Sequence, residues 1–215
     1  MKLQYFLARN KSRSMDNLNT LGEREVQTLM EIIRIHNPKY SFNRKTFVDV
    51  GCGDAYLRNP VEKHSMLYNG FDIDDCDLLS DQMPLLSNSV DILVCYSVIE
   101  HLIDPSNMLN EAKRVLKKGG FLFVETPNWE YCHKTFYHDY THVKPYTAGS
   151  LNALITDFGF DVLSLMPNVR CKSRFYNDSK FNFKVARYLP FRGFGGPFSF
   201  LKGRSTGIFC LATPS

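Results

Sequence analysis

Residues 46–55 constrain the fold of this chain more than any other stretch. They read TFVDVGCGDA, an apolar run rich in β-branched residues that breaks abruptly into glycines. A helix is predicted to follow over residues 56–63. A strand, a tight glycine turn and a helix start form a cradle for a nucleotide-containing cofactor, because glycines let the backbone approach a ligand and the helix N-terminus presents unpaired N–H groups.

A second apolar run, over residues 66–71, ends in Asp72. In doubly wound folds a second strand offers a carboxylate to the cofactor ribose about 20 residues after the glycine turn. The spacing therefore predicts that Asp72 accepts hydrogen bonds from ribose hydroxyls. The simpler alternative is that Asp72 only caps the end of a strand.

Two classes of cofactor use this geometry, and the details of the turn separate them. Dinucleotide-binding proteins need the pattern G-x-G-x-x-G, but the sixth position here is Tyr56, whose ring would obstruct close packing of helix on strand. The turn instead begins after an acidic residue and reads Asp49-x-Gly51-x-Gly53. This pattern resembles the first motif of class I S-adenosylmethionine (SAM) methyltransferases, with Ala55 in place of the last glycine. An NAD-dependent oxidoreductase is the first rival, and an ordinary strand-to-helix turn is the simplest alternative.

Length and composition favour one soluble domain spanning residues 1–215. The chain is 44% hydrophobic and 22% charged, and its net charge of +4 is too small to argue for nucleic acid. Six cysteines are scattered without a C-x-x-C pair, so we expect reduced thiols and a cytoplasmic protein. No apolar run has the length of a membrane span, and charges stand where a signal peptide needs an apolar core.

Residues 1–40 are predicted to form a helical cap, with an amphipathic helix over residues 21–35. Two placements are open for this helix: over the cofactor, as in many SAM methyltransferases, or against the edge of the sheet. Only eleven residues separate Asp72 from Pro84. Because a helix, a strand and two turns do not fit there, we expect no full helix and a rudimentary third strand near residues 77–79.

Residues 84–160 narrow the family. The segment from Pro84 to Asp91 leads into a strand at 92–95 and then into the tripeptide Glu-His-Leu at 100–102. Asp-Pro at 104–105 opens a helix that ends R-V-L-K-x-G-G at 114–120, and a strand at 121–127 ends in Thr-Pro-Asn at 126–128. Over residues 46–160 this block resembles the methyltransferases grouped with the ubiquinone-biosynthesis O-methyltransferases. Residues 96–99 read Y-S-V-I rather than N/D-P-P-Y/F, which argues against methylation of base amino groups.

The resemblance implies a Rossmann-like α/β fold, a mostly parallel sheet with an antiparallel last strand, shortened around the third strand. The cofactor-binding core is expected over residues 46–165 and the last strand over residues 207–213. SAM is the implied cofactor and S-adenosylhomocysteine (SAH) the product, with Asp77 beside the adenine. The residues implied in binding the cofactor are Asp49, Gly51, Cys52, Gly53, Asp72, Ile73, Asp77, Tyr96 and Ser97.

A hydroxyl acceptor must lose a proton, which favours a nearby base, and a neutral histidine suits that role near pH 7. His101 follows the fourth strand at the carboxyl edge of the sheet, and His142 lies in the segment expected to cover the pocket. Both are candidate catalytic residues, although His142 could instead be structural. His138 and His142 flank Asp139 at helical spacing and offer a metal alternative, but the segment is a poor helix and we expect no metal.

The acceptor itself is the least constrained part of the prediction. The segment H-x-K-P-Y-T at 142–147 resembles H-V-R-x-F-T of bacterial methyltransferases associated with glycan and cell-envelope synthesis. We therefore expect O-methylation of a small molecule, a sugar or a lipid-linked glycan intermediate, with N-methylation or non-catalytic SAM binding as alternatives. Residues 170–204 are dense in Lys, Arg, Phe and Tyr and could form an acceptor lid, a peripheral membrane anchor, a protein interface or a solvated loop.

Overall fold

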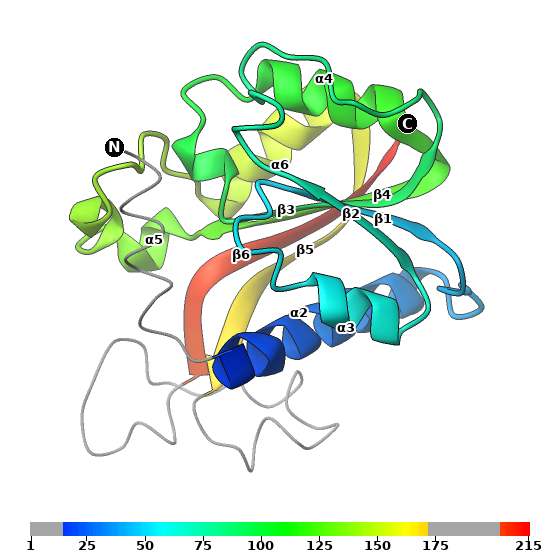
Figure 1. Ribbon diagram of the computed structural model, residues 1–215. Coiled ribbons are helices and arrows are strands. Elements are labelled where there is room, and N and C mark those ends of the chain that lie inside the picture. The colour runs from blue at the N-terminus through cyan, green and yellow to red at the C-terminus, as the bar shows by residue number, and fades with distance from the viewer. Residues whose placement is uncertain (1–14, 172–202) are drawn as a thin grey trace.

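The computed structural model describes the backbone of residues 15–171 and 203–215, and side chains over residues 21–166 and 207–215. These residues form three layers, with helices on both faces of one sheet (Figure 1). The sheet has the order β2-β1-β3-β4-β6-β5. Its strands are β1 (Thr46–Val50), β2 (Leu67–Phe71), β3 (Val90–Tyr96), β4 (Leu116–Pro127), β5 (Phe160–Cys171) and β6 (Gly203–Pro214).

The direction of the strands confirms the predicted Rossmann-like α/β fold. β1 pairs in parallel with β2 and β3, and β3 pairs in parallel with β4. The last strand, β6, lies between β4 and β5 and is antiparallel to both. Parallel neighbours need crossover connections. Helix α3 (Arg58–Lys63) lies in the connection from β1 to β2, and α4 (Ser106–Val115) in the connection from β3 to β4. Helix α6 (Ala148–Asp157) leads from β4 to β5, on the far side of β6.

Each face of the sheet buries its own apolar layer. One layer joins α4 and α6 to side chains such as Leu93 and Val124, and the other joins α2 (Met15–His36) and α3 to side chains such as Phe47 and Phe123. The central strand β3 is buried along its whole length because both faces are covered, as in other parallel sheets, whereas β2 at the edge is largely exposed. The N-terminal helix α2 therefore lies across a face of the sheet beside α3, not against the sheet edge (Figure 1).

Gly22 in α2 leaves space for Tyr56, whose ring stands where the dinucleotide-binding pattern requires a glycine. A Cβ on Gly22 would lie 2.7 Å from the carbonyl oxygen of Tyr56 and 3.1 Å from Cγ of Pro60. The hydroxyl of Tyr56 then donates to the carboxylate of Glu25, one turn further along α2. In dinucleotide-binding folds the third glycine allows a helix to pack closely on a strand. Here the close packing is instead between Gly22 of α2 and the residues around the start of α3.

The connection between β2 and β3 contains neither helix nor strand. The missing helix is confirmed, but the rudimentary strand near residues 77–79 is wrong. The reason lies in the acidic side chains of this loop, which take up backbone donors: Asp77 N–H donates to Asp81 Oδ2 at 2.8 Å, and Leu79 N–H donates to Asp77 Oδ1 at 2.9 Å. β2 is consequently the edge of the sheet.

Side chains of α4 hold this loop in place of a helix of its own. The guanidinium of Arg114 donates to the carbonyl oxygens of Leu85 at 2.9 Å and Met83 at 3.1 Å, and it forms an ion pair with Glu111 at 2.6 Å. Met83 also donates its backbone N–H to the Glu111 carboxylate at 2.8 Å. The loop is thus fixed by a charge network in which every member has a partner.

Three boundaries differ from the sequence prediction. α4 ends at Val115 and β4 begins at once, so the two lysines and two glycines at 117–120 belong to the strand and not to a helix end. There Lys117 forms an ion pair with Asp91 at 2.7 Å, which gives its ammonium a partner without a helix dipole. β5 and β6 also run longer than predicted, because they pair with each other as far as Cys171 and Gly203. The rest of the predicted insertion at 170–204 lies outside the described residues.

Two further observations bear on the sequence expectations. The five cysteines with described side chains are all free thiols. Across the described part of the chain, no helix combines the length and apolar character that a membrane span requires.

Candidate functional site

The glycine turn follows β1 at the carboxyl edge of the sheet. Gly51 has φ +70°, and a Cβ there would lie 2.4 Å from Cγ2 of Val98, which follows β3. Only glycine therefore allows Val98 to close against the turn. Gly53 and Ala55 also have positive φ, +50° and +51°. Ala55 keeps the backbone conformation of the glycine it replaces, at a cost of about 1–2 kcal/mol.

Asp72 stands at the end of β2, directly beside the turn. Its Oδ2 accepts a hydrogen bond from Gly53 N–H at 2.8 Å, and its Oδ1 accepts one from Ile73 N–H at 2.7 Å. Each carboxylate oxygen has a second lone pair to offer, and the side chain is only half-buried. The side chain of Ile73 is exposed next to it. Both residues are therefore accessible where the sequence places the ribose.

Asp49 is the buried charge of the site, with 2% of its surface exposed. The pKa of the Asp49 carboxyl is raised to about 7, mainly by burial and also by the charges of Glu25 and Asp72, while the 2.9 Å hydrogen bond from the Tyr68 hydroxyl opposes the rise. A cation brought next to Asp49 would favour its ionised form. Burial and the charge of Asp49 also raise the pKa of the Cys52 thiol to about 11, so this thiol stays neutral.

The remaining predicted cofactor residues lie in three settings. Tyr96 ends β3 inside the protein, and its hydroxyl donates to the backbone oxygen of Glu25 at 3.3 Å. Ser97 is exposed with φ +52°, and its hydroxyl donates to Glu125 Oε2 at 2.8 Å. Asp77 stabilises the turn described above in the loop after β2, and its place beside the adenine stays a prediction.

A second cluster forms where two distant segments meet. The 3₁₀ turn η1 (Ile99–His101) carries Glu100 and His101 directly after Val98. The backbone oxygen of Glu100 accepts from the N–H groups of Val143 at 2.9 Å and Lys144 at 3.1 Å. These bonds bring His142 onto η1. One ligand atom each from Glu100, His101 and His142 then lies within 4.8 Å of the others.

A backbone carbonyl lies beside Nδ1 of each histidine. His101 Nδ1 lies 3.1 Å from the carbonyl oxygen of Thr141, and His142 Nδ1 lies 2.7 Å from that of Phe136. A carbonyl oxygen only accepts, so each Nδ1 carries the hydrogen and each Nε2 keeps a lone pair when the ring is neutral. Both rings are therefore set to take up a proton or to bind a metal through Nε2.

Glu100 is fully buried, and its two oxygens differ. Oε2 accepts a hydrogen bond from the hydroxyl of Thr126 at 3.0 Å, whereas Oε1 has no hydrogen-bond partner among the described residues. The pKa of the Glu100 carboxyl is raised to about 8, mainly by burial and also by the charges of Glu125 and Asp139. A buried oxygen without a partner is uncommon in proteins, and the carboxylate that carries this one lies beside two histidines.

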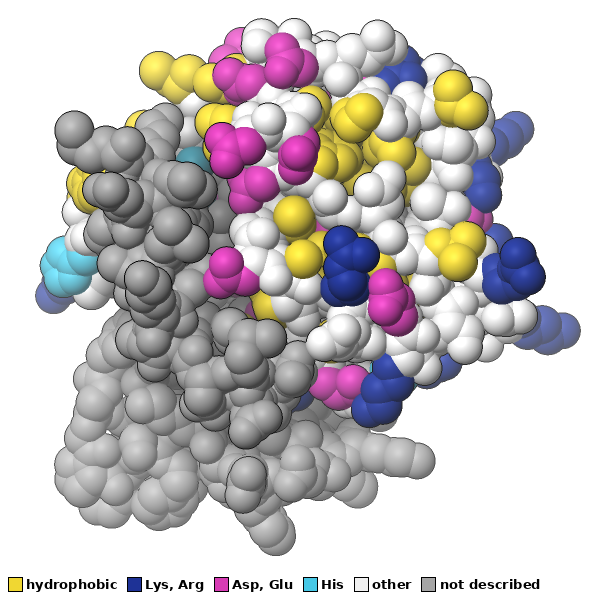
Figure 2. Space-filling view, viewed as in Figure 1, with side chains coloured by type: hydrophobic (Ala, Val, Ile, Leu, Met, Phe, Trp, Pro, Cys, Tyr) yellow, Lys and Arg dark blue, Asp and Glu magenta, His cyan; other side chains and the backbone are white. Residues whose placement is uncertain are grey.

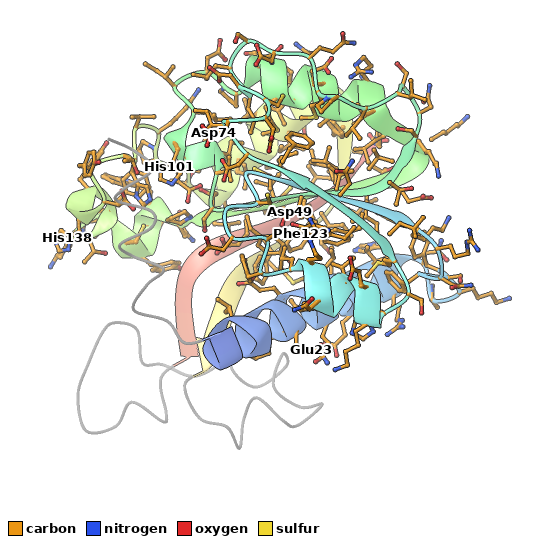
Figure 3. The ribbon with its side chains drawn as sticks, in the orientation of Figure 1. Glu23, Asp49, Asp74, His101, Phe123 and His138 are labelled. Atoms are coloured by element: carbon orange, nitrogen blue, oxygen red, sulfur yellow. The ribbon has the colours of Figure 1, made fainter. Side chains whose placement is uncertain are left out.

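The structure replaces the metal alternative that the sequence suggested. His138 is exposed in η2 (Phe136–His138), at the outer side of its segment and apart from His101 (Figure 3). His142, the other histidine of that suggested metal site, lies instead with Glu100 and His101. Sequence spacing did not predict the set of Glu100, His101 and His142, because the set depends on a contact between segments 40 residues apart. Only the tripeptide Glu-His-Leu at 100–102 indicated part of this set.

Acidic side chains gather on the face that carries the loop after β2 (Figure 2). Asp74, Asp75 and Asp81 are exposed there, close to Asp72 in the sequence. Such a surface favours a cationic ligand and disfavours a polyanion. The absence of a nucleic-acid partner stays a prediction.

A comparison of the sequence with known families decides its class. A family model described as a methyltransferase domain matches residues 7–165. The chain belongs to this methyltransferase family. One relative is a probable S-adenosylmethionine-dependent methyltransferase of Mycolicibacterium smegmatis, 28% identical over 54% of this chain and 51% of its own length. Another is a ubiquinone biosynthesis O-methyltransferase of Coxiella burnetii, 27% identical over 57% of this chain and 61% of its own length. The chain thus spans between half and two thirds of these relatives.

Solved methyltransferase structures share the fold. A SAM-dependent methyltransferase from Archaeoglobus fulgidus superposes with a TM-score of 0.63 at 18% identity, covering 97% of this chain and 99% of that one. Phosphoethanolamine N-methyltransferase 2 of Haemonchus contortus, in complex with SAM, gives a TM-score of 0.57 at 13% identity over 87% of this chain and 52% of that one.

The residues of this methyltransferase fit the cofactor of its family, SAM. The turn at Gly51 and Gly53 has no side chain to obstruct a ligand, and Asp72 offers free lone pairs to hydroxyl groups. Asp49 supplies a buried carboxylate for a ligand that carries positive charge on its sulfonium and its amine.

Proposed function

We propose that the protein transfers the methyl group of SAM to a hydroxyl of a small organic acceptor. The observation that carries the proposal is the continuity between the glycine turn and the histidine cluster. Val98 contacts the turn at Gly51, and its carbonyl oxygen accepts a hydrogen bond from His101 N–H at 2.9 Å. A group able to take a proton therefore stands next to the cofactor cradle.

The chain contributes mainly position. SAM supplies an electrophilic methyl group on a good leaving group, so holding an acceptor in line can provide roughly 7–11 kcal/mol of the barrier reduction. Asp72 would hold the ribose hydroxyls and Asp49 would lie near the cationic part of the cofactor. The acceptor hydroxyl would give its proton to Nε2 of His142 or His101 as the new bond to oxygen forms.

Aromatic side chains pack beside His142. Its ring lies 4.5 Å from the ring of Phe136, centroid to centroid, and Trp129 and Tyr137 pack against Phe136 at 5.4 Å and 5.0 Å. Phe136 is buried, but Tyr137 is exposed and Trp129 partly exposed, and these two rings would suit acceptors with an apolar face, among them aromatic rings and sugars. Hydroxyls on small molecules, sugars and lipid-linked glycans therefore remain the acceptor classes that we propose, and the names of the ubiquinone relatives favour a phenolic hydroxyl as the first to be tried.

The test is a transfer assay with methyl-labelled SAM and matched acceptors that carry a hydroxyl or an amine. If His142 is the base, His142→Ala lowers turnover by roughly 10²–10⁴-fold while the dissociation constant for SAM stays the same. The matched control is His138→Ala, which removes an exposed histidine of the same segment and should leave turnover unchanged. Labelling of amines alone would contradict the proposal.

A second candidate is favoured by the ligand set itself. Proteins often bind a catalytic divalent cation through two histidines and one carboxylate. In such sites each histidine commonly donates its other ring N–H to a carbonyl oxygen, as both histidines do here. We propose that such a cation could bind Glu100, His101 and His142 and polarise the acceptor oxygen. Ligand atoms around one cation lie at most about 4.2 Å apart, so binding would draw the three groups inward from their present spacing.

Chelation distinguishes the two candidates. If a cation takes part, dialysis against a chelator abolishes turnover, and Mn²⁺ or Zn²⁺ both restores it and raises the melting temperature of the wild type. Glu100→Gln should lose that thermal shift. If turnover is the same before and after chelation and no ion shifts the melting temperature, the histidines act as bases without a metal.

A further inference from the structure

A chain of hydrogen bonds leads from a buried carboxylate to His101 through a threonine. Thr141 Oγ1 lies 2.6 Å from Asp139 Oδ1 and 2.9 Å from His101 Nδ1. The backbone N–H of Thr141 also donates to Asp139 Oδ1 at 3.1 Å. Asp139 is 7% exposed, so these contacts lie inside the protein.

The direction of each hydrogen follows from the donors and acceptors present. The carboxylate of Asp139 only accepts when ionised, so the single hydroxyl hydrogen of Thr141 points to Asp139. The oxygen of that hydroxyl is then an acceptor toward His101, and the hydrogen between them belongs to Nδ1. The Thr141 carbonyl requires the same assignment. Two independent contacts therefore place the hydrogen on Nδ1 of His101.

The same carboxylate also lies close to the second histidine. Asp139 Oδ2 is 4.0 Å from His142 Nε2, and the two imidazole rings are 4.8 Å apart between centroids. One buried charge is thus placed to interact with His101 through Thr141 and with His142 directly. Positive charge gathered by either ring, as a proton or through a cation, is balanced by this one group.

We propose that Asp139 and Thr141 are positioning residues of the acceptor site, which hold the His101 ring with its hydrogen on Nδ1. The inference rests on the proposed function at the same site and applies whether Nε2 takes a proton or a metal. In an ordinary turn Asp139 would only accept from the backbone N–H of Thr141. Such a turn does not explain the contact between His101 Nδ1 and the Thr141 hydroxyl.

Two variants of Thr141 separate positioning from simple packing. Thr141→Val keeps the shape of the side chain and removes the hydroxyl, whereas Thr141→Ser keeps the hydroxyl and removes a methyl group. We expect Thr141→Val to lower kcat roughly 10–100-fold, as for other groups that orient a functional histidine, with unchanged KM for SAM and melting temperature. Thr141→Ser should stay close to the wild type. Equal activity of Thr141→Val and wild type, or equal losses in both variants, would overturn the proposal.

A second readout does not depend on turnover. The ¹⁵N chemical shifts of the His101 ring report which nitrogen carries the hydrogen in the neutral form. The wild type should show the Nδ1–H tautomer, and Thr141→Val should show a larger share of Nε2–H. If the wild type shows Nε2–H, or if the variant shows the same tautomer share as the wild type, the positioning role is wrong. This result stands even if no acceptor is methylated and only the proposed function fails.

Discussion

The carboxylate of Asp72 accepts a hydrogen bond from the backbone N–H of Gly53, with 2.8 Å between Oδ2 and N, and joins the end of β2 to the glycine turn 19 residues earlier. The same side chain is half-buried, so it can still be reached by a ligand. One group therefore organises the loop before the ligand arrives and remains available to the ligand.

Asp72→Ala should weaken SAM binding by about 1.5–3 kcal/mol, the loss expected for hydrogen bonds to a charged group. Isothermal titration calorimetry measures it directly. Asp74→Ala is the matched control, since Asp74 is exposed two residues further on and should bind SAM as the wild type does. Equal affinities for the Asp72 and Asp74 variants would show that the carboxylate of Asp72 does not contact the cofactor.

Gly51→Ala should abolish measurable SAM binding, because the new Cβ would lie 2.4 Å from Val98 Cγ2 in a backbone with φ +70°. Gly119→Ala controls for the backbone strain alone: Gly119 has φ +74°, and nothing lies within 4 Å of its Cβ position. Adding Val98→Ala to Gly51→Ala should restore part of the affinity. If the double variant binds no better than the single one, contact with Val98 is not the reason for the glycine.

Asp49→Asn should change how stability depends on pH in the absence of cofactor. The pKa of Asp49 is raised to about 7 by burial. The wild type thus keeps its full stability only below the ordinary aspartate pKa and loses stability as pH rises through 7, where a buried charge must form. The variant has no such charge. The melting temperature of the variant minus that of the wild type should therefore grow between pH 5 and pH 8. A difference that does not vary with pH would contradict the assigned burial of a titrating carboxyl.

Gly22→Ala should destabilise the protein, although glycine to alanine inside a helix normally stabilises by about 1 kcal/mol. The reason is the 2.7 Å distance from the added Cβ to the Tyr56 carbonyl oxygen. Gly149→Ala in α6 is the matched control, because only Thr147 Oγ1, at 3.9 Å, lies near that Cβ. Chemical denaturation of both variants should show opposite signs. A stabilised Gly22→Ala would mean that α2 does not pack this closely.

The proximity of Asp72 to the glycine turn could be predicted because these residues are close in sequence. The strand, the glycines and the first residue after β2 follow one another within about 25 residues, and parallel strands bring their carboxyl ends to one edge of the sheet. The packing around Tyr56 could not be predicted in the same way. The Tyr56 ring correctly argued against a dinucleotide, but the glycine that makes room for it, Gly22, comes from a different helix.

The acceptor half could be predicted only in part. Both histidines stood out as candidates, but Glu100 and Thr141 did not, because their roles depend on bonds between η1 and residues 139–144. The strand expected near residues 77–79 failed for a similar reason: side-chain carboxylates of Asp77 and Asp81 satisfy the backbone donors that a strand would have paired. Contacts between distant segments, and side chains that take up backbone donors, leave no periodic pattern in the sequence from which they could be predicted.

The most direct test of the account is transfer of a labelled methyl group from SAM to paired acceptors, one with a hydroxyl and one with an amine at the same position, by wild type and His142→Ala. The account predicts that the wild type labels the hydroxyl acceptor. If His142 takes the proton or binds the cation, His142→Ala loses roughly 10²–10⁴-fold in turnover with unchanged SAM affinity. Labelling of the amine alone would contradict the account, and full hydroxyl labelling by His142→Ala would exclude His142 as the base and as a metal ligand.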